Sequence, residues 1–173
     1  KADWKGVCEN FLTADGVFWP VPVNLDVSGE DAAGINNGDE IALFDPEGDE
    51  IMATMTVTEK WEQSDAEKKW ECEKVYMGEG TPTAEEFWKI AEEDHPGVQM
   101  VMQQKPVNLA GPVKVLSEGD YPTRYAGVYH RPAESRKIFE DRGWSEVAAL
   151  QLRNPMHRSH EYLCKIAVEV CDG

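Results

Sequence analysis

The sequence predicts an α+β protein in which a small twisted β barrel or sandwich precedes the start of an α/β unit. Three observations indicate this fold class. Residues 16–61 hold short apolar runs separated by turn signals, a pattern typical of β structure. Between Ser64 and Gly97 the apolar period changes to that of helices. Near the end, an apolar run at 146–150 leads into a helical pattern that ends near Val170, as expected where a buried strand precedes a helix.

The β unit is expected to contain an edge strand, a hairpin and a returning strand. Residues 16–27 include Pro20 and Pro22, which cannot donate to a ladder and therefore favour an edge position. Two β-rich runs flank the Asp-Pro-Glu-Gly turn signal at 45–48, which predicts a hairpin. The run at 106–116 predicts one more, irregular strand that returns to the β unit.

Three helices have recognisable ends. Thr83 and Glu86 form a capping-box pattern at the start of the first helix, and His-Pro-Gly at 95–97 ends it. Pro132 at the first position and Gly143 after the last mark the second helix. The third begins close to residue 157 and carries an apolar stripe. Its members are Leu163, Ile166, Ala167 and Val170.

Composition and charge exclude several classes of partner. The 173 residues are 41% hydrophobic and 29% charged, as in ordinary globular domains, and the net charge is −16. From residue 131 onward there are seven Lys and Arg and seven Asp and Glu residues, so the whole excess lies in residues 1–130. Nucleic acid is therefore an unfavourable partner, and we interpret the acidic part as a solvated surface. The sequence contains no apolar run of membrane-spanning length and no leader pattern, so we expect no membrane partner and a cytoplasmic location.

Isolated cysteines and one histidine are expected to be structural. Cys8, Cys72, Cys164 and Cys171 are widely spaced and form no C-x-x-C pair, which favours buried or inert thiols over a disulfide framework. His95 stands alone beside a helix end, a position more typical of a structural than of a catalytic histidine.

The residues suited to binding or catalysis are concentrated in a polar stretch, residues 151–160, at the expected strand-to-helix junction. α/β proteins bind anions at such junctions. Arg153 offers a planar fork that matches two oxygens of a sulfate or phosphate. His157 and His160 are three residues apart and share one face of the first helical turn, near the positive end of the helix dipole. Gln151 and Asn154 add uncharged donors. The stretch holds no carboxylate and no evident nucleophile with its own base, which indicates an oxyanion or nucleotide site that works by direct transfer.

Two other interpretations of these residues stay open. His157, His160, Cys164 and Cys171 recur at helical spacing, and a helix face can give Zn²⁺ two or three ligands, although Cys171 lies too far from His160 to share its ion. Alternatively, the protein is an acidic, non-catalytic β-barrel binding module that recognises a protein or a small anion.

A family resemblance favours the anion site. Residues 151–160 read QLRNPMHRSH, which is similar to the Q-x-R-N-P-x-H-x-x-H signature of ATP sulfurylases (sulfate adenylyltransferases), members of the H-x-x-H nucleotidyltransferase superfamily. Most of the chain resembles this family, and in particular the dissimilatory enzymes of sulfate-reducing microbes. Further landmarks are the stretches at 19–27, 95–98, 131–136 and 143–144.

The resemblance implies a domain organisation. Residues 1–130 correspond to a PUA-like β-barrel domain whose N-terminal part is missing. Residues 131–173 correspond to a linker helix and the first βα unit of a Rossmann-like α/β nucleotidyltransferase domain. The chain also starts inside a helical pattern, so the sequence is expected to be an internal fragment.

The resemblance also implies an activity and its partners. ATP and sulfate give adenylyl sulfate and pyrophosphate by in-line attack of sulfate on the α-phosphate. Mg²⁺ accompanies ATP, no protein-bound metal is expected in this chain, and the family is homo-oligomeric.

Matching the signature position by position assigns roles to six residues. Sulfate binding falls to Gln151 and Arg153. The catalytic residues are Arg153, Asn154, His157 and His160. Nucleotide contacts come from Gln151, Leu152, Arg153, Asn154, His157 and His160. Most family members have Thr where this chain has Leu152, so only its backbone can take part. A later G-R-D-H-A-G-type loop of the family is not found, and we therefore expect no measurable activity from the 173-residue chain alone.

Overall fold

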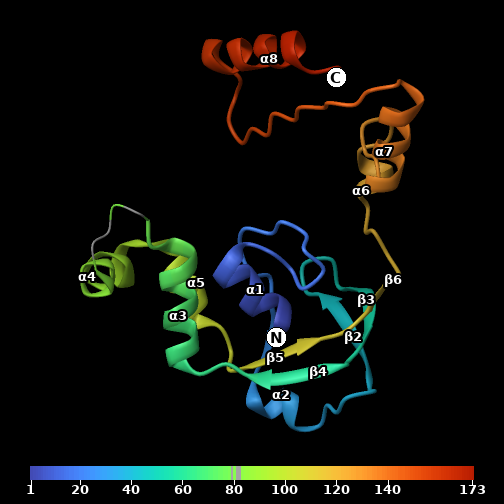
Figure 1. The fold of residues 1–173 in the computed structure, drawn as a ribbon. Helices are drawn as coiled ribbons and strands as arrows, with labels where there is room; N and C mark the ends of the chain where they lie inside the picture. The colour runs from blue at the N-terminus through green and yellow to red at the C-terminus, as the bar shows by residue number, and fades with distance from the viewer. Residues whose placement is uncertain (79, 81–82) are drawn as a thin grey trace. The chain divides into compact units, whose positions relative to one another are not determined.

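The structure, a computed structural model, describes residues 1–78, 80 and 83–173, without the side chains of residues 90 and 92–94. It forms two compact units, Lys1–Ser117 and Glu118–Gly173 (Figure 1). The helices of the first unit are α1 (Ala2–Asn10), α2 (Gly29–Ala33), α3 (Asp65–Tyr76), α4 (Ala84–Asp94) and α5 (Pro96–Gln103). Its strands are β1 (Leu25–Val27), β2 (Glu40–Asp45), β3 (Glu50–Thr56), β4 (Glu59–Glu62), β5 (Val107–Ala110) and β6 (Val113–Val115). The second unit contains α6 (Tyr121–Arg124), α7 (Pro132–Asp141) and α8 (Arg158–Val170).

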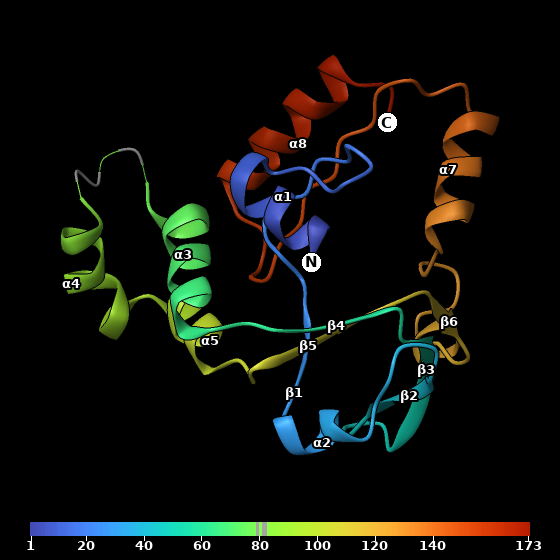
Figure 2. The same ribbon diagram turned by 60° about the horizontal axis from the view of Figure 1, so that its bottom comes forward.

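Two antiparallel three-stranded sheets form the β part of the first unit, in the orders β1-β5-β4 and β2-β3-β6 (Figure 2). The predicted hairpin is confirmed: β2 pairs with β3 around the turn at 45–48, with a register shift between Leu43 and Phe44. Of the two expected arrangements, a barrel or a sandwich, the described residues do not form a closed barrel, because the two sheets are not joined into one ladder. Apolar side chains form the core of this β part. The buried members are Ala32, Met55, Val57, Val107 and Leu109.

The chain passes from one sheet to the other at Gly111. The returning run at 106–116 is therefore two strands, β5 and β6, and each pairs in a different sheet. Thr58 N donates to Ala110 O at 2.8 Å, and Thr56 N donates to Pro112 O at 3.1 Å, so Gly111 lies flat against β3. A Cβ added at Gly111 would stand 1.8 Å from Thr56 O. Only glycine allows this approach of two backbones.

Gly111→Ala is expected to lower the free energy of unfolding of the first unit by about 3 kcal/mol, because a backbone carbonyl cannot move aside without breaking the ladder. Denaturant unfolding followed by tryptophan fluorescence measures the effect. Gly34→Ala is the matched control, since a Cβ there meets no atom within 4 Å. Equal stability of the two variants would contradict the crossing as described.

Helices α3, α4 and α5 pack together into a second core (Figure 1). The predicted start of α4 is confirmed, with Thr83 Oγ1 accepting from Glu86 N at 3.2 Å. The predicted end of this helix at 95–97 is confirmed, because α4 ends at Asp94 and His95 is its C-cap. The sequence did not indicate that another helix, α5, follows directly. Pro96 takes the first position of α5, where its missing N–H costs nothing, so it starts a helix and the chain only changes direction.

His95 is a structural residue at this bend. Its Nδ1 accepts from Val98 N at 3.3 Å, and its ring lies 4.8 Å from that of Tyr76. These contacts join the end of α4 to the start of α5 and to α3.

The edge strand predicted over residues 16–27 is wrong for most of its length. Only Leu25–Val27 form a strand, which pairs with β5. The preceding residues form a loop in which Trp19 N donates to Phe11 O at 2.8 Å. Pro20 and Pro22 have no N–H to give to a ladder, which explains why pairing begins only after them.

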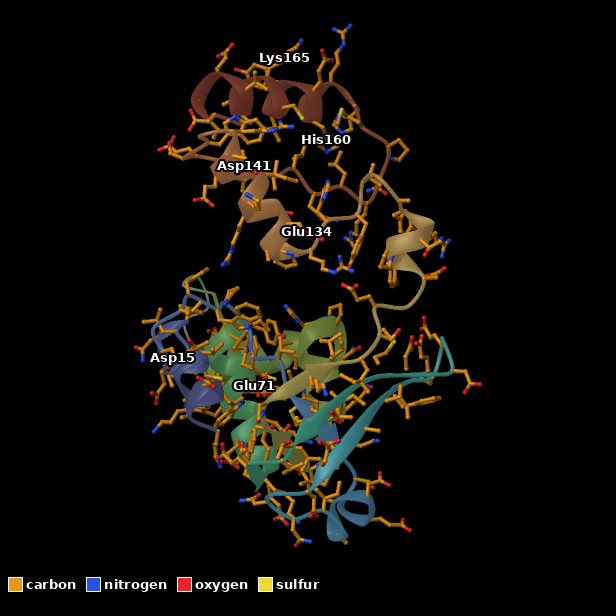
Figure 3. All side chains as sticks on the ribbon, turned by 90° about the vertical axis from the view of Figure 1, so that its right-hand side faces the viewer. Asp15, Glu71, Glu134, Asp141, His160 and Lys165 are labelled. Carbon is orange, nitrogen blue, oxygen red and sulfur yellow. The ribbon has the colours of Figure 1, made fainter. Side chains whose placement is uncertain are left out.

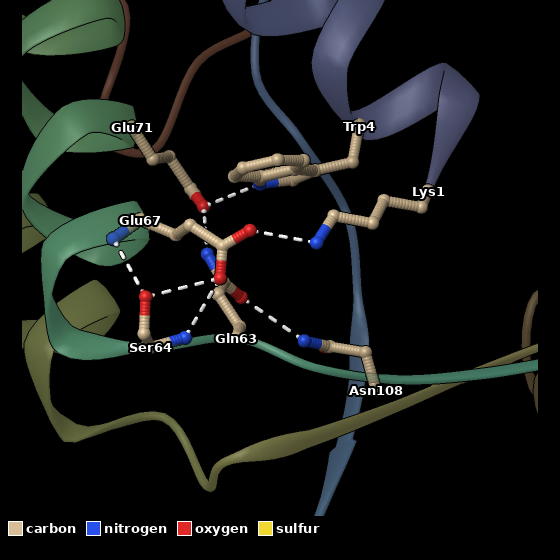
Figure 4. Close-up of polar contacts among 7 residues, drawn as sticks. All are labelled: Lys1, Trp4, Gln63, Ser64, Glu67, Glu71 and Asn108. Atoms are coloured by element: carbon tan, nitrogen blue, oxygen red, sulfur yellow. Dashed lines mark hydrogen bonds and ion pairs between the residues drawn. The ribbon is translucent and has the colours of Figure 1, made fainter.

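A buried polar network ties α1, α3 and β5 together (Figure 4). Glu71 is 2% exposed, and its Oε2 accepts from Trp4 Nε1 at 2.7 Å and from Gln63 Nε2 at 2.8 Å. Gln63 Oε1 accepts in turn from Asn108 Nδ2 at 3.0 Å. On the neighbouring turn of α3, the Lys1 ammonium holds the pKa of the Glu67 carboxyl below its usual range. Hydrogen bonds replace water around these buried polar groups.

All four cysteines, each among the described residues, are free thiols. The expectation of buried thiols is confirmed for Cys8 and Cys72, whereas Cys164 and Cys171 are partly exposed. Burial is the main cause that raises the pKa of Cys8 and of Cys72 to about 12, and the nearby Glu71 carboxylate adds to the shift. Thiolates are therefore disfavoured at both buried sites.

Thiol titration of the native chain at pH 8 is expected to modify Cys164 and Cys171 rapidly, and Cys8 and Cys72 only after denaturation. Stability should also depend on pH. In the unfolded chain the two thiols ionise near pH 9, but in the folded state only near pH 12, so stability falls as pH rises between these values. A Cys8→Ala, Cys72→Ala double variant should have a shallower fall. Rapid native labelling of either buried thiol would contradict this prediction.

The second unit confirms two helix predictions. Helix α7 begins with Pro132 at its first position, and Gly143, with φ of 69°, follows its end. Helix α8 begins after His157. The predicted loop over 119–130 also contains the short helix α6. None of the helices in the described part of the chain is long and apolar enough to cross a membrane.

The buried strand predicted at 146–150 is wrong in this unit. These residues are all described and form no strand, and Val147 and Leu150 are 41% and 43% exposed. Two backbone hydrogen bonds, Ala148 N to Gly173 O and Asp172 N to Glu146 O, hold the segment beside the end of α8. A strand of a parallel sheet needs neighbours that cover both faces, which this unit does not supply. The apolar stripe of α8 is uncovered for the same reason, with Leu163 51% exposed.

Candidate functional site

The polar stretch lies where the sequence places it, immediately before α8. Residues 151–157 are irregular backbone, and His157 is the N-cap of the helix. His160 occupies the first turn, and Figure 3 shows it projecting from a different side of α8 than Lys165. The start of the helix thus presents its positive dipole end on the side from which the polar stretch enters.

His157 and His160 form a reciprocal cap. His157 Nδ1 accepts from Ser159 N at 3.3 Å, and His160 Nδ1 accepts from His157 N at 3.3 Å. The ring centroids are 4.1 Å apart. A backbone N–H can only donate, so each Nδ1 must be unprotonated, and each neutral ring carries its proton on Nε2. Both imidazoles can therefore donate from Nε2 to an anion while their Nδ1 atoms hold the helix start in place.

The other predicted donors are exposed and available. Gln151 makes one weak contact, from its Nε2 to Leu152 O at 3.3 Å. Across the described residues, the side chains of Arg153 and Asn154 make no hydrogen bond or ion pair. The structure thus brings the two histidines into contact with each other, and leaves Arg153 and Asn154 on the same short segment without contact to them.

Ser159 is a residue that sequence reasoning missed. Its Oγ lies 3.0 Å from His157 Nδ1, so a hydroxyl does stand beside a base, contrary to the expectation from the sequence. The i, i+2 spacing at a helix start is the available signal, because side chains at this position commonly bond to the N-cap residue. The same Nδ1 also accepts from Ser159 N, which shows a capping contact.

The charge around the site favours anions. Glu161 is the carboxylate in the first turn of α8, and Lys165 Nζ pairs with it at 2.7 Å. Arg153 makes no ion pair with an acidic side chain among the described residues, so no neighbouring carboxylate offsets its charge. An anion at the start of α8 would therefore meet a cation and several N–H donors.

Metal ligands do not gather at this site. Among the described residues, no group of three or more His, Cys, Asp or Glu side chains is placed to hold a metal ion. Mg²⁺ prefers oxygen ligands, whereas the polar stretch offers mainly nitrogen donors, so its residues do not fit this ion directly.

Comparison with known proteins agrees with the division of the chain into two parts. Residues 1–118 match the family of PUA-like domains, and residues 126–172 match the ATP-sulfurylase family. A solved structure, a hexameric APS kinase from Thiobacillus denitrificans, superposes with a TM-score of 0.58 at 25% identity, over 97% of this chain and 26% of that chain.

Curated relatives are similar over the whole chain. A sulfate adenylyltransferase from Desulfatibacillum aliphaticivorans is 76% identical over 173 residues, and one from Desulfovibrio desulfuricans is 60% identical over 173 residues. The chain spans only 41% and 40% of the length of these two relatives. The chain therefore belongs to the PUA-like domain family, whose model covers residues 1–118, and its residues 126–172 are similar to the ATP-sulfurylase family.

Proposed function

We propose that this chain contributes residues that bind sulfate and the phosphates of ATP in a sulfate adenylyltransferase. Such an enzyme converts ATP and sulfate to adenylyl sulfate and pyrophosphate. The observation that carries the proposal is the set of free donors at 151–160 before α8, in a segment that matches the ATP-sulfurylase family. Relatives of this name that align with the entire chain support it.

In the proposed reaction a sulfate oxygen attacks the α-phosphorus of ATP, a new P–O bond forms, and the bond to pyrophosphate breaks. Arg153 and Gln151 hold two sulfate oxygens. Arg153 suits this role because its fork is free and exposed, so none of its hydrogen bonds must break before sulfate binds. Asn154 donates to the α-phosphate, and Leu152 contributes its backbone alone.

The two histidines stabilise charge on the phosphates in this proposal. Their Nε2–H groups donate to the transferring and leaving phosphates, where negative charge grows in the transition state. Their reciprocal capping fixes both rings beforehand, which reduces reorganisation during the reaction. Positioning and electrostatics thus supply the rate, as in other phosphoryl and nucleotidyl transfers.

Mg²⁺ would enter this site with ATP, bound by phosphate oxygens rather than by the residues at 151–160. When bound, it would neutralise part of the triphosphate charge.

Ser159 is assigned a capping role, not a nucleophilic one, because its hydroxyl and its N–H meet the same histidine nitrogen. Ser159→Ala is expected to retain adenylyl-transfer activity, because direct transfer requires no serine nucleophile. Accumulation of a covalent adenylyl-enzyme in the wild type and its loss in Ser159→Ala would refute that assignment.

The experiment that tests the function compares two polypeptides. The 173-residue chain is expected to form no adenylyl sulfate from ATP and sulfate, because it spans only 41% and 40% of the length of the two relatives. The same chain, extended to the full length of its relatives, is expected to release pyrophosphate in a sulfate-dependent manner. Robust activity of the 173-residue chain, or sulfate-independent release by the extended one, would contradict the proposal.

Three further features belong to this proposal. The domain boundary lies at residues 130 and 131, so that residues 131–173 join the catalytic domain. The assembled enzyme is a homo-oligomer, which the hexameric structural neighbour supports. The reaction takes place in the cytoplasm, where ATP is available.

A further inference from the structure

The loop at 149–156, which carries Gln151 and Arg153, has no hydrogen bond to any other segment of the described chain. Its residues form no backbone–backbone hydrogen bond, and the contact of Gln151 Nε2 with Leu152 O lies inside the loop. Its far end joins His157, the N-cap of α8. The position of Arg153 is therefore set by the segments that flank the loop.

A clamp formed by Asp172 with residues 145 and 146 fixes the near end of the loop. Asp172 Oδ2 accepts from Ser145 N at 2.7 Å, from Ser145 Oγ at 2.8 Å and from Glu146 N at 3.1 Å. Two backbone hydrogen bonds lie beside it, from Asp172 N to Glu146 O and from Ala148 N to Gly173 O. The donors, above all Ser145 N, hold the pKa of the Asp172 carboxyl below its usual range. The acceptor is therefore charged at neutral pH, and its hydrogen bonds are of the stronger, charge-assisted kind.

The indole of Trp144 supports the same clamp by packing. A Cβ added at Gly173 would overlap this ring, so the Gly173 backbone lies directly against the indole. The indole also meets the end of α7, with the Phe139 ring centroid at 6.1 Å and the Arg142 guanidinium carbon at 4.7 Å from its centroid. The end of α8 is thus joined both to residues 144–148 and to α7.

The length of α8 leaves the loop little slack. The 13 residues of this helix span about 20 Å. The chain leaves Ala148 beside the end of the helix and returns to His157 at its start, a path that can cover at most about 30 Å (Figure 1). A slip of one residue at the clamp would therefore move Arg153 by up to about 3.3 Å. That displacement exceeds the range of distances over which a hydrogen bond forms.

We propose that Asp172 is a positioning residue for the sulfate-binding side chains. Its carboxylate fixes residues 145–148 against the end of α8, and this sets where Gln151 and Arg153 lie relative to the two histidines at the start of the same helix. The histidines are carried by the helix itself, so the clamp affects sulfate more than the phosphates of ATP. The effect on sulfate rests on the proposed function, whereas the effect on the loop does not.

The effect on the loop is measured on the ¹⁵N-labelled 173-residue chain. Asp172→Ala is expected to shift the amide resonances of residues 151–154 and to lower their ¹H–¹⁵N heteronuclear NOE, because the near end of the loop is released. The Ser159 amide, which the N-cap histidine holds, should keep its resonance. Asp141→Ala removes an exposed carboxylate of α7 that pairs only with Lys137, and as the matched control it should leave residues 151–154 unchanged. Unchanged spectra of residues 151–154 in Asp172→Ala would overturn the proposal.

The effect on sulfate is measured in the polypeptide extended to the length of its relatives. Asp172→Ala should raise the KM for sulfate about tenfold and leave the KM for ATP unchanged, because a small misplacement of a binding group is costly. Asp172→Asn keeps an acceptor oxygen and should restore most of the affinity for sulfate. In an Arg153→Ala background, Asp172→Ala should cause little further loss, because a positioning residue acts through the group that it positions.

Two kinetic results would contradict the positioning role. One is an equal rise in the KM for ATP and for sulfate, and the other is the same tenfold loss in the Arg153→Ala background. Sulfate-independent release of pyrophosphate would instead refute the proposed function. The spectra of the 173-residue chain would then still decide whether Asp172 places the loop.

Discussion

Arg153→Ala, in the polypeptide extended to the length of its relatives, is expected to lower sulfate-dependent pyrophosphate release about 10²- to 10³-fold. The Arg153 side chain is exposed and makes no hydrogen bond or ion pair within the described residues, so its removal is expected to leave the fold intact. What is lost is a charged, two-pronged donor at the position where sulfate would be held. Initial rates at saturating ATP and varied sulfate measure the loss.

Two companion variants make the test specific. Arg153→Lys keeps the charge but loses the fork, and should restore only part of the rate. Arg136→Ala removes an exposed arginine of α7 in the same unit and should behave like the wild type. Wild-type rates in Arg153→Ala, or an equal loss in Arg136→Ala, would refute the assignment of Arg153.

Glu71→Leu is expected to lower the free energy of unfolding of the first unit by about 4 kcal/mol, since two buried donors lose their acceptor. Trp4 Nε1 and Gln63 Nε2 both donate to the same oxygen, Oε2 (Figure 4). Leucine fills a similar space but accepts nothing. Denaturant unfolding followed by tryptophan fluorescence measures the change.

Glu71→Gln is the matched control for this prediction. One amide oxygen can accept both hydrogen bonds, so this variant should lose only about 1 kcal/mol. If the leucine variant were as stable as the glutamine variant, the two hydrogen bonds accepted from Trp4 and Gln63 would contribute nothing measurable to stability. That result would contradict the stabilising role of the network.

Local signals in the sequence predicted local structure well. Thr83 and Pro132 mark helix starts, and Asp45 with Gly48 marks the hairpin turn, because these side chains and backbones act within a few residues. His95 and Pro96 correctly mark the end of α4, but the start of α5 at Pro96 was missed, since a proline after a helix also suits the first position of the next one. The apolar run at 146–150 predicted a strand, but these residues form none. A strand requires neighbouring strands to pair with, and a local apolar pattern does not supply them.

Some features of the candidate site could likewise be predicted from residue types, and others only from the structure. The residue types at 151–160 determined by themselves that the stretch is rich in hydrogen-bond donors, because arginine, asparagine and glutamine side chains carry N–H groups in any fold. Only the structure showed that both histidine Nδ1 atoms bind backbone N–H groups, which leaves Nε2 as the donor. The contact of Ser159 with His157 likewise depends on where α8 begins.

The sequence by itself determined the hairpin turn at 45–48, the starts of α4, α7 and α8, the family resemblance and the hydrogen-bond donors at residues 151–160, since these depend on side-chain type and on neighbours in the chain. Tertiary structure decided that two sheets meet at Gly111 without closing into a barrel, that Glu71 is buried with Trp4 and Gln63, and that Asp172 binds Ser145 and Glu146. These features join residues far apart in the chain, and their energies depend on packing and burial, which no local pattern records.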